Sequence, residues 1–233
     1  MGWVMIPLRD TIPSSSFPFV NIAIIILNIL IFLYEVSLGN QIHLFINKYG
    51  LIPAYLIFSP DITTFERIYP FFTSMFLHGG WFHLIGNMLF LYVFGDNVED
   101  RMGHFRYLLF YLLSGIAAAF TQILTNVYST VPMVGASGAI SGVLGAYMLF
   151  FPASRILTLV PIFFFIQLVE IPAVVFLFIW FIIQFFSGIA SLAVAQNTGG
   201  IAFWAHIGGF VAGLALARFF QKRRYYYRAR WFR

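Results

Sequence analysis

Two residues far apart in this sequence have the side chains of a nucleophile and its general base. Ser137 stands in the glycine-flanked run Gly-Ala-Ser-Gly, and His206 is followed by glycines three and seven positions later. A histidine within hydrogen-bonding distance of a serine can take the hydroxyl proton and return it to the leaving group. No Asp or Glu is expected at the same depth as these two residues. A serine–histidine dyad is therefore the serine mechanism that the sequence predicts.

A second pair, His83 and Asn87, is spaced by one helical turn, so both side chains share one helix face. At the depth of Ser137 they would donate hydrogen bonds to an oxyanion beside the Ser137 backbone N–H. Each feature alone has an ordinary explanation, because His–Asn pairs, thin serine patches and histidines in tight seams also join membrane helices. Their combination at matched depths favours catalysis.

The composition predicts the elements that must position these residues. The 233-residue chain is 61% hydrophobic and 9% charged, with a mean hydropathy of +0.90, whereas a soluble domain carries about 25% charged residues. Apolar windows of about 20 residues, enough to cross a hydrocarbon core about 30 Å thick, recur along the chain. We expect one all-α polytopic membrane domain over residues 1–233, with a six-span core at 17–219. The expected spans are 17–38, 82–98, 104–126, 137–152, 171–195 and 201–219.

Two segments between the spans need separate interpretation. Residues 39–81 contain three prolines, a glycine pair and many aromatics, which predicts a long interfacial loop between the first two spans. The apolar stretch from Ile156 to Ala195 is interrupted by Pro161 and Pro172, so it could hold two tight spans or one span with a membrane-dipping lead. The charge distribution favours the single span.

Six spans separate the charges as the positive-inside rule requires. Of the 13 Lys and Arg residues, all but Lys48 and Arg67 then lie on one side. We therefore expect a cell-membrane protein with both termini cytoplasmic, including an N-terminal segment at 1–16 and a basic tail at 220–233. Such a tail is typical of a segment resting on anionic lipid, so nucleic acid is not an expected partner.

Close helix packing is predicted between the fourth and sixth spans. Ser137, Ser141 and Gly145 form a stripe of small residues at helical spacing, and Gly209 and Gly213 form another beside His206. Two thin stripes allow two helix backbones to approach each other. This packing would bring Ser137 and His206 together at the outer ends of their helices.

Other chemistries are less consistent with the sequence. The chain has no cysteine, which excludes a disulfide, a thiolate nucleophile and a cysteine-ligated metal. His78, His83 and His206 could suggest zinc, but no zinc-protease helix motif is present, and we expect no metal and no cofactor. A proton relay through His83 and His206 in a channel or transporter would need polar residues along the whole path across the bilayer.

The motifs together resemble those of the rhomboid family of intramembrane serine proteases. The resemblance rests on His78-Gly-Gly-Trp-Phe-His83-Leu-Ile-Gly-Asn87, on Gly135-Ala-Ser137-Gly138 and on Ala205-His206-Ile-Gly-Gly209-Phe-Val-Ala-Gly213, in that order. It covers nearly the whole chain. It implies a six-span rhomboid-like fold and an endopeptidase that cleaves the transmembrane segments of single-span proteins.

The resemblance also implies a role for each motif residue. Ser137 would be the nucleophile and His206 the general base, with His83, Asn87 and the Ser137 amide as oxyanion donors. His78 would brace the first loop. The turn from Glu99 to Gly103 resembles a family turn that we expect to be structural, and substrate would enter between the second and fifth spans.

Two positions depart from the family pattern. Tyr69-Pro70 stands where many members have a Trp-Arg pair, and Ser141 stands where some place a tyrosine under the catalytic histidine. Neither departure removes a reacting group. The main alternative is a catalytically inactive rhomboid-like protein that binds other membrane proteins. The sequence predicts neither the substrate's identity nor the oligomeric state.

Overall fold

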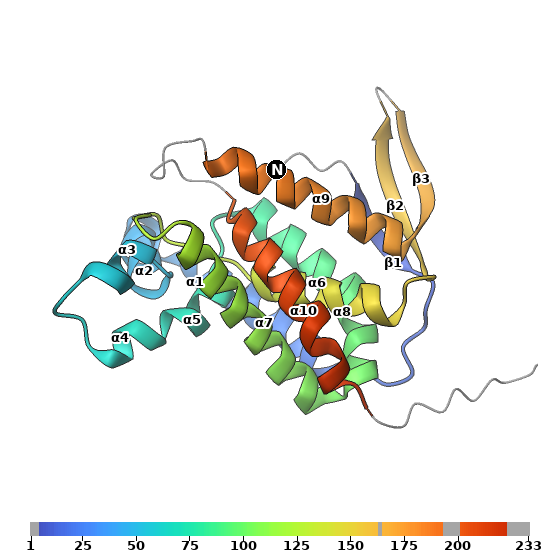
Figure 1. The fold of residues 1–233 in the computed structure, drawn as a ribbon, viewed down its shortest axis with the longest axis horizontal. Helices are drawn as coiled ribbons and strands as arrows, with labels where there is room; N and C mark the ends of the chain where they lie inside the picture. The colour runs from blue at the N-terminus through green and yellow to red at the C-terminus, as the bar shows by residue number, and fades with distance from the viewer. Residues whose placement is uncertain (1–4, 163–164, 193–200, 223–233) are drawn as a thin grey trace, which may run out of the picture.

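The computed structural model describes residues 5–162, 165–192 and 201–222, which are mostly helical (Figure 1). The long helices are α1 (Phe19–Ser37), α6 (Trp81–Met102), α7 (His104–Thr125), α8 (Ser137–Phe150), α9 (Ala173–Leu192) and α10 (Phe203–Phe220). The segment between α1 and α6 holds the short helices η1 (Gly39–Gln41), α2 (Ile42–Tyr49), α3 (Pro53–Phe58), α4 (Thr64–Ile68), α5 (Pro70–Thr73) and η2 (Ser74–Phe76). The described strands are β1 (Ile6–Asp10), β2 (Arg155–Ile162) and β3 (Phe165–Pro172). The predicted end of the fifth span at 193–195 and the tail from 223 onward lie outside the described residues.

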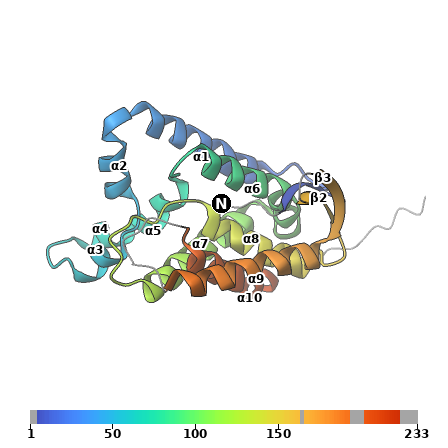
Figure 2. The same ribbon diagram turned by 90° about the horizontal axis from the view of Figure 1, so that it is seen from above.

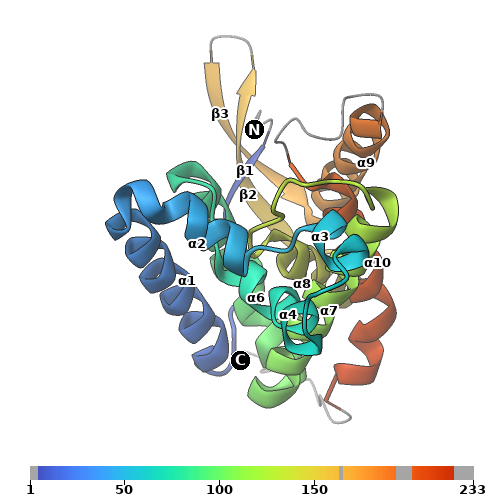
Figure 3. The ribbon, with the colours of Figure 1, turned by 90° about the vertical axis from the view of Figure 1, so that its left-hand side faces the viewer.

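Helix α8 lies in the middle of the bundle. Every residue from Gly138 to Tyr147 is buried, and Figure 2 shows α6 and α8 between α1 on one side and α9 and α10 on the other. The largest fully buried side chains of the bundle are aromatic, namely Phe94, Tyr107, Phe110, Tyr111, Tyr147 and Phe176. The short helices α2–α5 cover one end of the bundle (Figure 3). A helix at the centre of the bundle can hold a reactive group away from lipid.

The backbones of α8 and α10 are in direct contact. A Cβ atom built on Gly209 would overlap the Gly138 carbonyl, and one on Gly213 would overlap the Gly142 carbonyl. From the other side, a Cβ on Gly145 would overlap the Phe210 carbonyl. Gly209 and Gly213 therefore meet α8 as predicted, but they contact the backbone at Gly138 and Gly142 rather than at Ser137. We define the glycine seam as Gly138, Gly142, Gly145, Gly209 and Gly213.

The predicted spans correspond to six long helices, although not all of them could cross a membrane unaided. Among the described residues, α1, α7, α9 and α10 are long and apolar enough to span by length and composition. Helix α8 has 14 residues and rises only about 21 Å, less than a hydrocarbon core of about 30 Å. Its burial explains this, because protein rather than lipid surrounds it. Helix α6 has a buried polar end at Asn97, Glu99 and Asp100.

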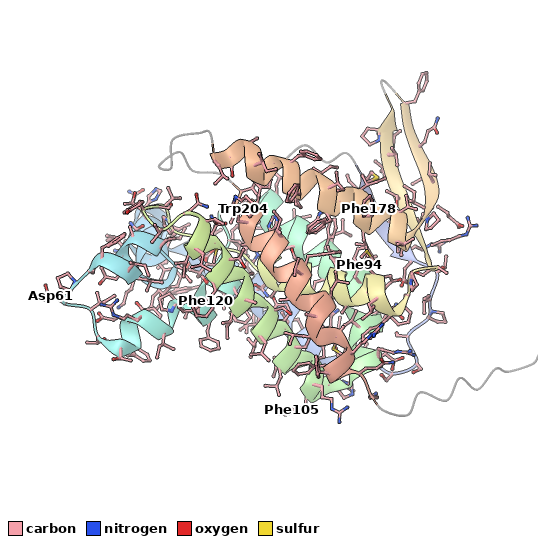
Figure 4. All side chains as sticks on the ribbon, viewed as in Figure 1. Asp61, Phe94, Phe105, Phe120, Phe178 and Trp204 are labelled. Carbon is pink, nitrogen blue, oxygen red and sulfur yellow. The ribbon has the colours of Figure 1, made fainter. Side chains whose placement is uncertain are left out.

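The outside of the bundle is as apolar as a membrane protein requires. Phe105 and Phe120 on α7 are 71% and 53% exposed, and Figure 4 shows both on the outer surface of that helix. Asp61, by contrast, lies at the far tip of the loop between α3 and α4 (Figure 4). The exposed apolar side chains are those of a surface that faces lipid.

The expectation of an all-α chain is wrong for two segments. The predicted membrane-dipping lead is a β-hairpin, in which Arg155 pairs with Pro172 and Ile162 with Phe165. β1 pairs antiparallel with β2, so the predicted N-terminal segment is not separate from the core. Prolines that prevent a helix are tolerated on edge strands and at strand ends. The partner strand β1 is distant in the sequence, so the local pattern did not predict the sheet.

A partly buried carboxylate anchors β1 to the helices. The Asp10 carboxylate accepts a hydrogen bond from Asn97 Nδ2 on α6 at 2.8 Å and another from the Tyr147 hydroxyl on α8. Burial raises the pKa of Asp10 above its ordinary value, and the Tyr147 hydrogen bond opposes that shift. The N-terminal strand is thus held by side chains as well as by its sheet partner.

The last turn of α6 caps the first helix. The Glu99 carboxylate accepts from the backbone N–H groups of Val20 and Asn21, at 3.0 and 2.7 Å, in the first turn of α1. These N–H groups have no partner within the helix. Gly103 ends α6 with φ at 85°, a conformation that favours glycine. The turn therefore has the structural role predicted for it.

The glycine seam predicts a large effect of a single methyl group. We expect Gly213→Ala to destabilise the fold and lower the thermal unfolding midpoint, because the added Cβ would overlap the α8 backbone and overpacking costs about 1–3 kcal/mol. Gly79→Ala is the control, since the nearest atom to its added Cβ is 3.9 Å away. Equal midpoints for the two variants would contradict close backbone contact at the seam.

Candidate active site

The structure brings Ser137 and His206 together. Ser137 Oγ lies 2.8 Å from His206 Nε2. Ser137 is the first residue of α8, and His206 lies in the first turn of α10. Because the glycine seam aligns these two helix starts, residues 69 positions apart reach hydrogen-bonding distance. His206 is only 3% exposed, so little water competes for its ring.

The turn before Ser137 places the nucleophile against α6. Gly135 has φ at 126°, and its N–H donates to the Ser74 carbonyl at 2.9 Å. A Cβ at this position would lie 2.7 Å from the His83 ring and 3.6 Å from Asn87 Nδ2. Glycine is therefore required both by conformation and by space. The absence of a side chain lets the turn approach the face of α6 that carries both polar residues.

Hydrogen-bond donors converge beside Ser137. Asn87 Nδ2 is buried and has no hydrogen-bond partner among the described residues, and leaving such a donor unpaired costs roughly 1–3 kcal/mol. His83 Nδ1 accepts from the Gly79 N–H at 3.4 Å, which leaves Nε2 to carry the proton. The arrangement therefore offers two side-chain donors near the start of α8, where backbone N–H groups are also free of helical partners.

A cavity of about 100 Å³ adjoins Ser137, His206 and Asn87, whereas His83 is not among its described lining residues. Four helices and the residue before β1 contribute to its lining, which consists of Met5, Gly86, Asn87, Phe90, Ser137, Ile140, Ser141, Leu144, Phe176, Trp180, Ile183, Gln184 and His206. The polar atoms lie at Asn87, Ser137, Ser141, Gln184 and His206, and the other side chains are apolar. The serine, the histidine and the unpaired asparagine amide therefore share one cavity.

His78 lies behind the donor face rather than on it. Its backbone N–H donates to the Glu35 carboxylate at 3.2 Å, and its ring packs edge-on against Phe32 of α1 and against His83. Burial lowers the pKa of His78 to about 3, and the nearby His83 acts in the same direction. His78 thus connects α1 to the start of α6, which agrees with a bracing role.

The expectation that no carboxylate lies near this depth is wrong for Glu35. Glu35 is fully buried near the end of α1 and accepts from His78, as described above. Its isolated position among apolar residues of the first span was the available signal. Glu35 has no described hydrogen bond to His206, so the pair Ser137–His206 has no carboxylate partner among the described contacts.

Sequence reasoning also missed the residue that contacts the other side of His206. Gln184 Oε1 lies 2.8 Å from His206 Nδ1, and Trp180, one turn earlier on α9, has its ring centroid 6.0 Å from that of His206. Gln184 is a polar residue in a strongly apolar span, which was a usable signal. Its partner depends on how α9 packs against α10, which the sequence does not reveal.

The two departures from the family pattern have clear structural consequences. The Tyr69 hydroxyl donates to the Lys48 carbonyl at 2.6 Å, and Arg67 donates to the carbonyls of Leu56 and Ser59, so other contacts anchor the first loop. Ser141 Oγ donates to the Ser137 carbonyl at 2.7 Å. Aromatic rings do reach His206, but they come from Trp180 on α9 and Phe203 on α10.

Comparison with known proteins gives consistent matches. The family model of the Rhomboid domain matches residues 66–223. RHOMBOID-like protein 1 of Arabidopsis thaliana is 32% identical over 161 residues, which cover 69% of this chain and 36% of the relative. Rhomboid protease GluP of Bacillus subtilis is 43% identical over 76 residues, covering 33% of this chain and 14% of the relative. Inactive rhomboid protein 1 of Drosophila melanogaster is 30% identical over 112 residues, which cover 48% of this chain and 7% of the relative. The chain spans less than half the length of each.

The contact between Glu35 and His78 predicts that the acceptor oxygen of Glu35 contributes more to stability than its charge does. Glu35→Ala would leave the buried His78 N–H unpaired, so we expect the free energy of unfolding to fall by roughly 1–3 kcal/mol. Glu35→Gln keeps an acceptor oxygen, so its free energy of unfolding should fall less. Thermal unfolding in detergent measures both, and an alanine variant as stable as the wild type would show that Glu35 does not hold the loop.

Proposed function

The chain belongs to the rhomboid family, and on that basis we propose that it is an intramembrane serine endopeptidase using Ser137 and His206 as a catalytic dyad. The observation that carries the proposal is the 2.8 Å contact between Ser137 Oγ and His206 Nε2. The unpartnered Asn87 amide on the wall of the same cavity supports it. The proposed substrates are transmembrane segments of single-span membrane proteins.

The proposed reaction proceeds through an acyl-enzyme. Ser137 Oγ attacks the scissile carbonyl carbon while His206 Nε2 accepts the hydroxyl proton. The carbonyl oxygen becomes an oxyanion, which accepts hydrogen bonds from the Ser137 N–H, Asn87 Nδ2 and His83 Nε2. His206 then gives the proton to the amine as the C–N bond breaks. A water molecule releases the acyl group by the same steps, with His206 again as base, and restores Ser137.

The proposed membrane arrangement has six spans. Helices α6 and α8 would cross together with α1, α7, α9 and α10, with α8 surrounded by the other helices, and both termini would be cytoplasmic in the cell membrane. The positive charges at Arg101, Arg106, Arg155, Arg218 and Lys222 lie in loops or helix ends that this topology places on one side. The end carrying α2–α5 would face outward.

The cavity lining also supports a route for the substrate. Asn87 and Phe90 of α6 and Ile183 of α9 line the cavity together, whereas Phe94 of α6 packs on Phe176 of α9 with ring centroids 6.0 Å apart. We propose that the substrate helix enters between α6 and α9 and reaches Ser137 in an extended form.

The dyad proposal predicts complete loss of cleavage when either partner is removed. Ser137→Ala and His206→Ala should each abolish cleavage of a single-span substrate by the purified protein, because the nucleophile or its base is missing. Circular dichroism and thermal unfolding control for the fold. Full activity in Ser137→Ala would contradict the mechanism, and a folded wild type that binds but never cleaves such substrates would favour the inactive-binder alternative.

The oxyanion proposal predicts a defect in turnover for Asn87. Removal of one such donor costs roughly a hundredfold in turnover, so we expect Asn87→Ala to lower kcat by about that factor with KM nearly unchanged. Asn28→Ala is the matched control, because Asn28 is a buried asparagine on α1 that donates to its own helix at Ile24. If both variants lose stability but keep wild-type kcat, Asn87 only joins helices.

A further inference from the structure

The geometry around His206 points to a role for Gln184 that rests on the proposed function. We propose that Gln184 is a positioning residue: it holds His206 in the tautomer that can accept the Ser137 proton, and it does so only while α9 is seated against α10. The general base of the dyad would therefore be held by a third residue. That residue lies on the helix that lines the proposed substrate route.

The hydrogen-bond pattern determines the tautomer. Gln184 Oε1 can only accept a hydrogen bond, so at 2.8 Å it requires a proton on His206 Nδ1. A neutral ring with its proton on Nδ1 has its lone pair on Nε2, which is the atom 2.8 Å from Ser137 Oγ. The opposite tautomer would present an N–H to the serine and could not act as a base. Gln184 is 7% exposed, so little water can replace it.

The orientation of the ring is also determined from α9. Trp180 and Gln184 lie one turn apart on the same face of α9, and the Trp180 ring is tilted by 33° to the His206 ring. The described aromatic partner on α10 itself is Phe203, which meets the His206 ring edge-on with centroids 6.4 Å apart. His206 thus belongs to one helix, but a neighbouring helix contributes the acceptor and the ring that covers its face.

The attachment of α9 differs from that of α8. The α8–α10 contact is backbone against backbone along the glycine seam, which fixes Ser137 relative to His206. Helix α9 meets α10 through side chains. The Phe181 and Phe210 rings have centroids 5.0 Å apart, and the Ile207 side chain of α10 lies against Gly188 of α9. Helix α9 can therefore move without breaking the seam, and such a movement would remove the Nδ1 acceptor while leaving the serine beside the histidine.

An acceptor oxygen facing His206 Nδ1 is what this position supplies. Glutamine provides the acceptor oxygen without a charge. The same chemistry gives a sharp test, because leucine removes the acceptor at similar volume and glutamate keeps it.

The first experiment compares kcat and KM for a peptide substrate in purified variants. We expect Gln184→Leu to lower kcat by about tenfold or more with KM unchanged, since correct general-base function is worth roughly a hundredfold or more, and Gln184→Glu to keep most of the wild-type kcat. Gln122→Leu is the matched control, because Gln122 Oε1 accepts from the Ala205 backbone N–H at 3.2 Å and not from the His206 ring. If Gln184→Leu does not fold, Gln184→Met replaces it.

The outcomes separate this inference from the proposed function. An active wild type with an unchanged kcat in Gln184→Leu, or a Gln184→Glu variant as impaired as the leucine variant, would overturn the positioning role alone. An inactive wild type would overturn the proposed function itself. A loss of thermal stability with wild-type kcat would show that Gln184 only packs α9 onto α10.

A cross-link tests the dependence on α9. A Cβ on Gly188 would lie 3.6 Å from the Phe203 Cβ, within the range of a disulfide, and the chain has no cysteine of its own. In Gly188→Cys/Phe203→Cys, oxidation fixes α9 on α10. We expect the oxidised form to react with a small serine-directed fluorophosphonate at least as fast as the reduced form. A several-fold slower reaction on oxidation would contradict the claim that a seated α9 prepares the base.

Discussion

The direct contact between the backbones of α8 and α10 is the constraint on which the rest of the site depends. A Cβ on Gly145, Gly209 or Gly213 would overlap the backbone of the facing helix, so no side chain fits between the two helices at these positions. This contact aligns the first residue of α8 with the first turn of α10. Without it, Ser137 and His206 would be separated by the width of ordinary side chains, and no hydrogen bond between them would form.

The remaining polar groups inside the bundle serve this arrangement in different ways. Glu99 caps the start of α1, Glu35 accepts from the His78 backbone, and Asp10 anchors β1 to α6 and α8. Glu35 and Glu99 are fully buried and Asp10 is partly buried, and each has a described hydrogen-bond partner, as the removal of a carboxyl group from water requires. Asn87 Nδ2 has none among the described residues. A donor left unpaired at the wall of a cavity is consistent with a ligand oxygen as its missing partner.

The sequence predicted those features that depend on local pattern. Helical stretches followed from apolar length, the seam from glycine spacing, and the Ser137–His206 contact from the seam. The strand pairing of β1, the Glu35–His78 contact and the Gln184–His206 contact could not be predicted, because each joins elements whose relative placement has no local signature. The short α8 shows the same limit: its length alone argues against a span, and its burial becomes visible only in the fold.

The central claim is that Ser137 is a nucleophile made reactive by His206. The most direct measurement is mass-spectrometric location of the adduct formed when the folded protein reacts with a fluorophosphonate, in which an Oγ–P bond forms and fluoride leaves. We expect an adduct on Ser137 in the wild type and none in His206→Ala. A folded wild type with no adduct, or with an adduct at a different serine, would contradict it.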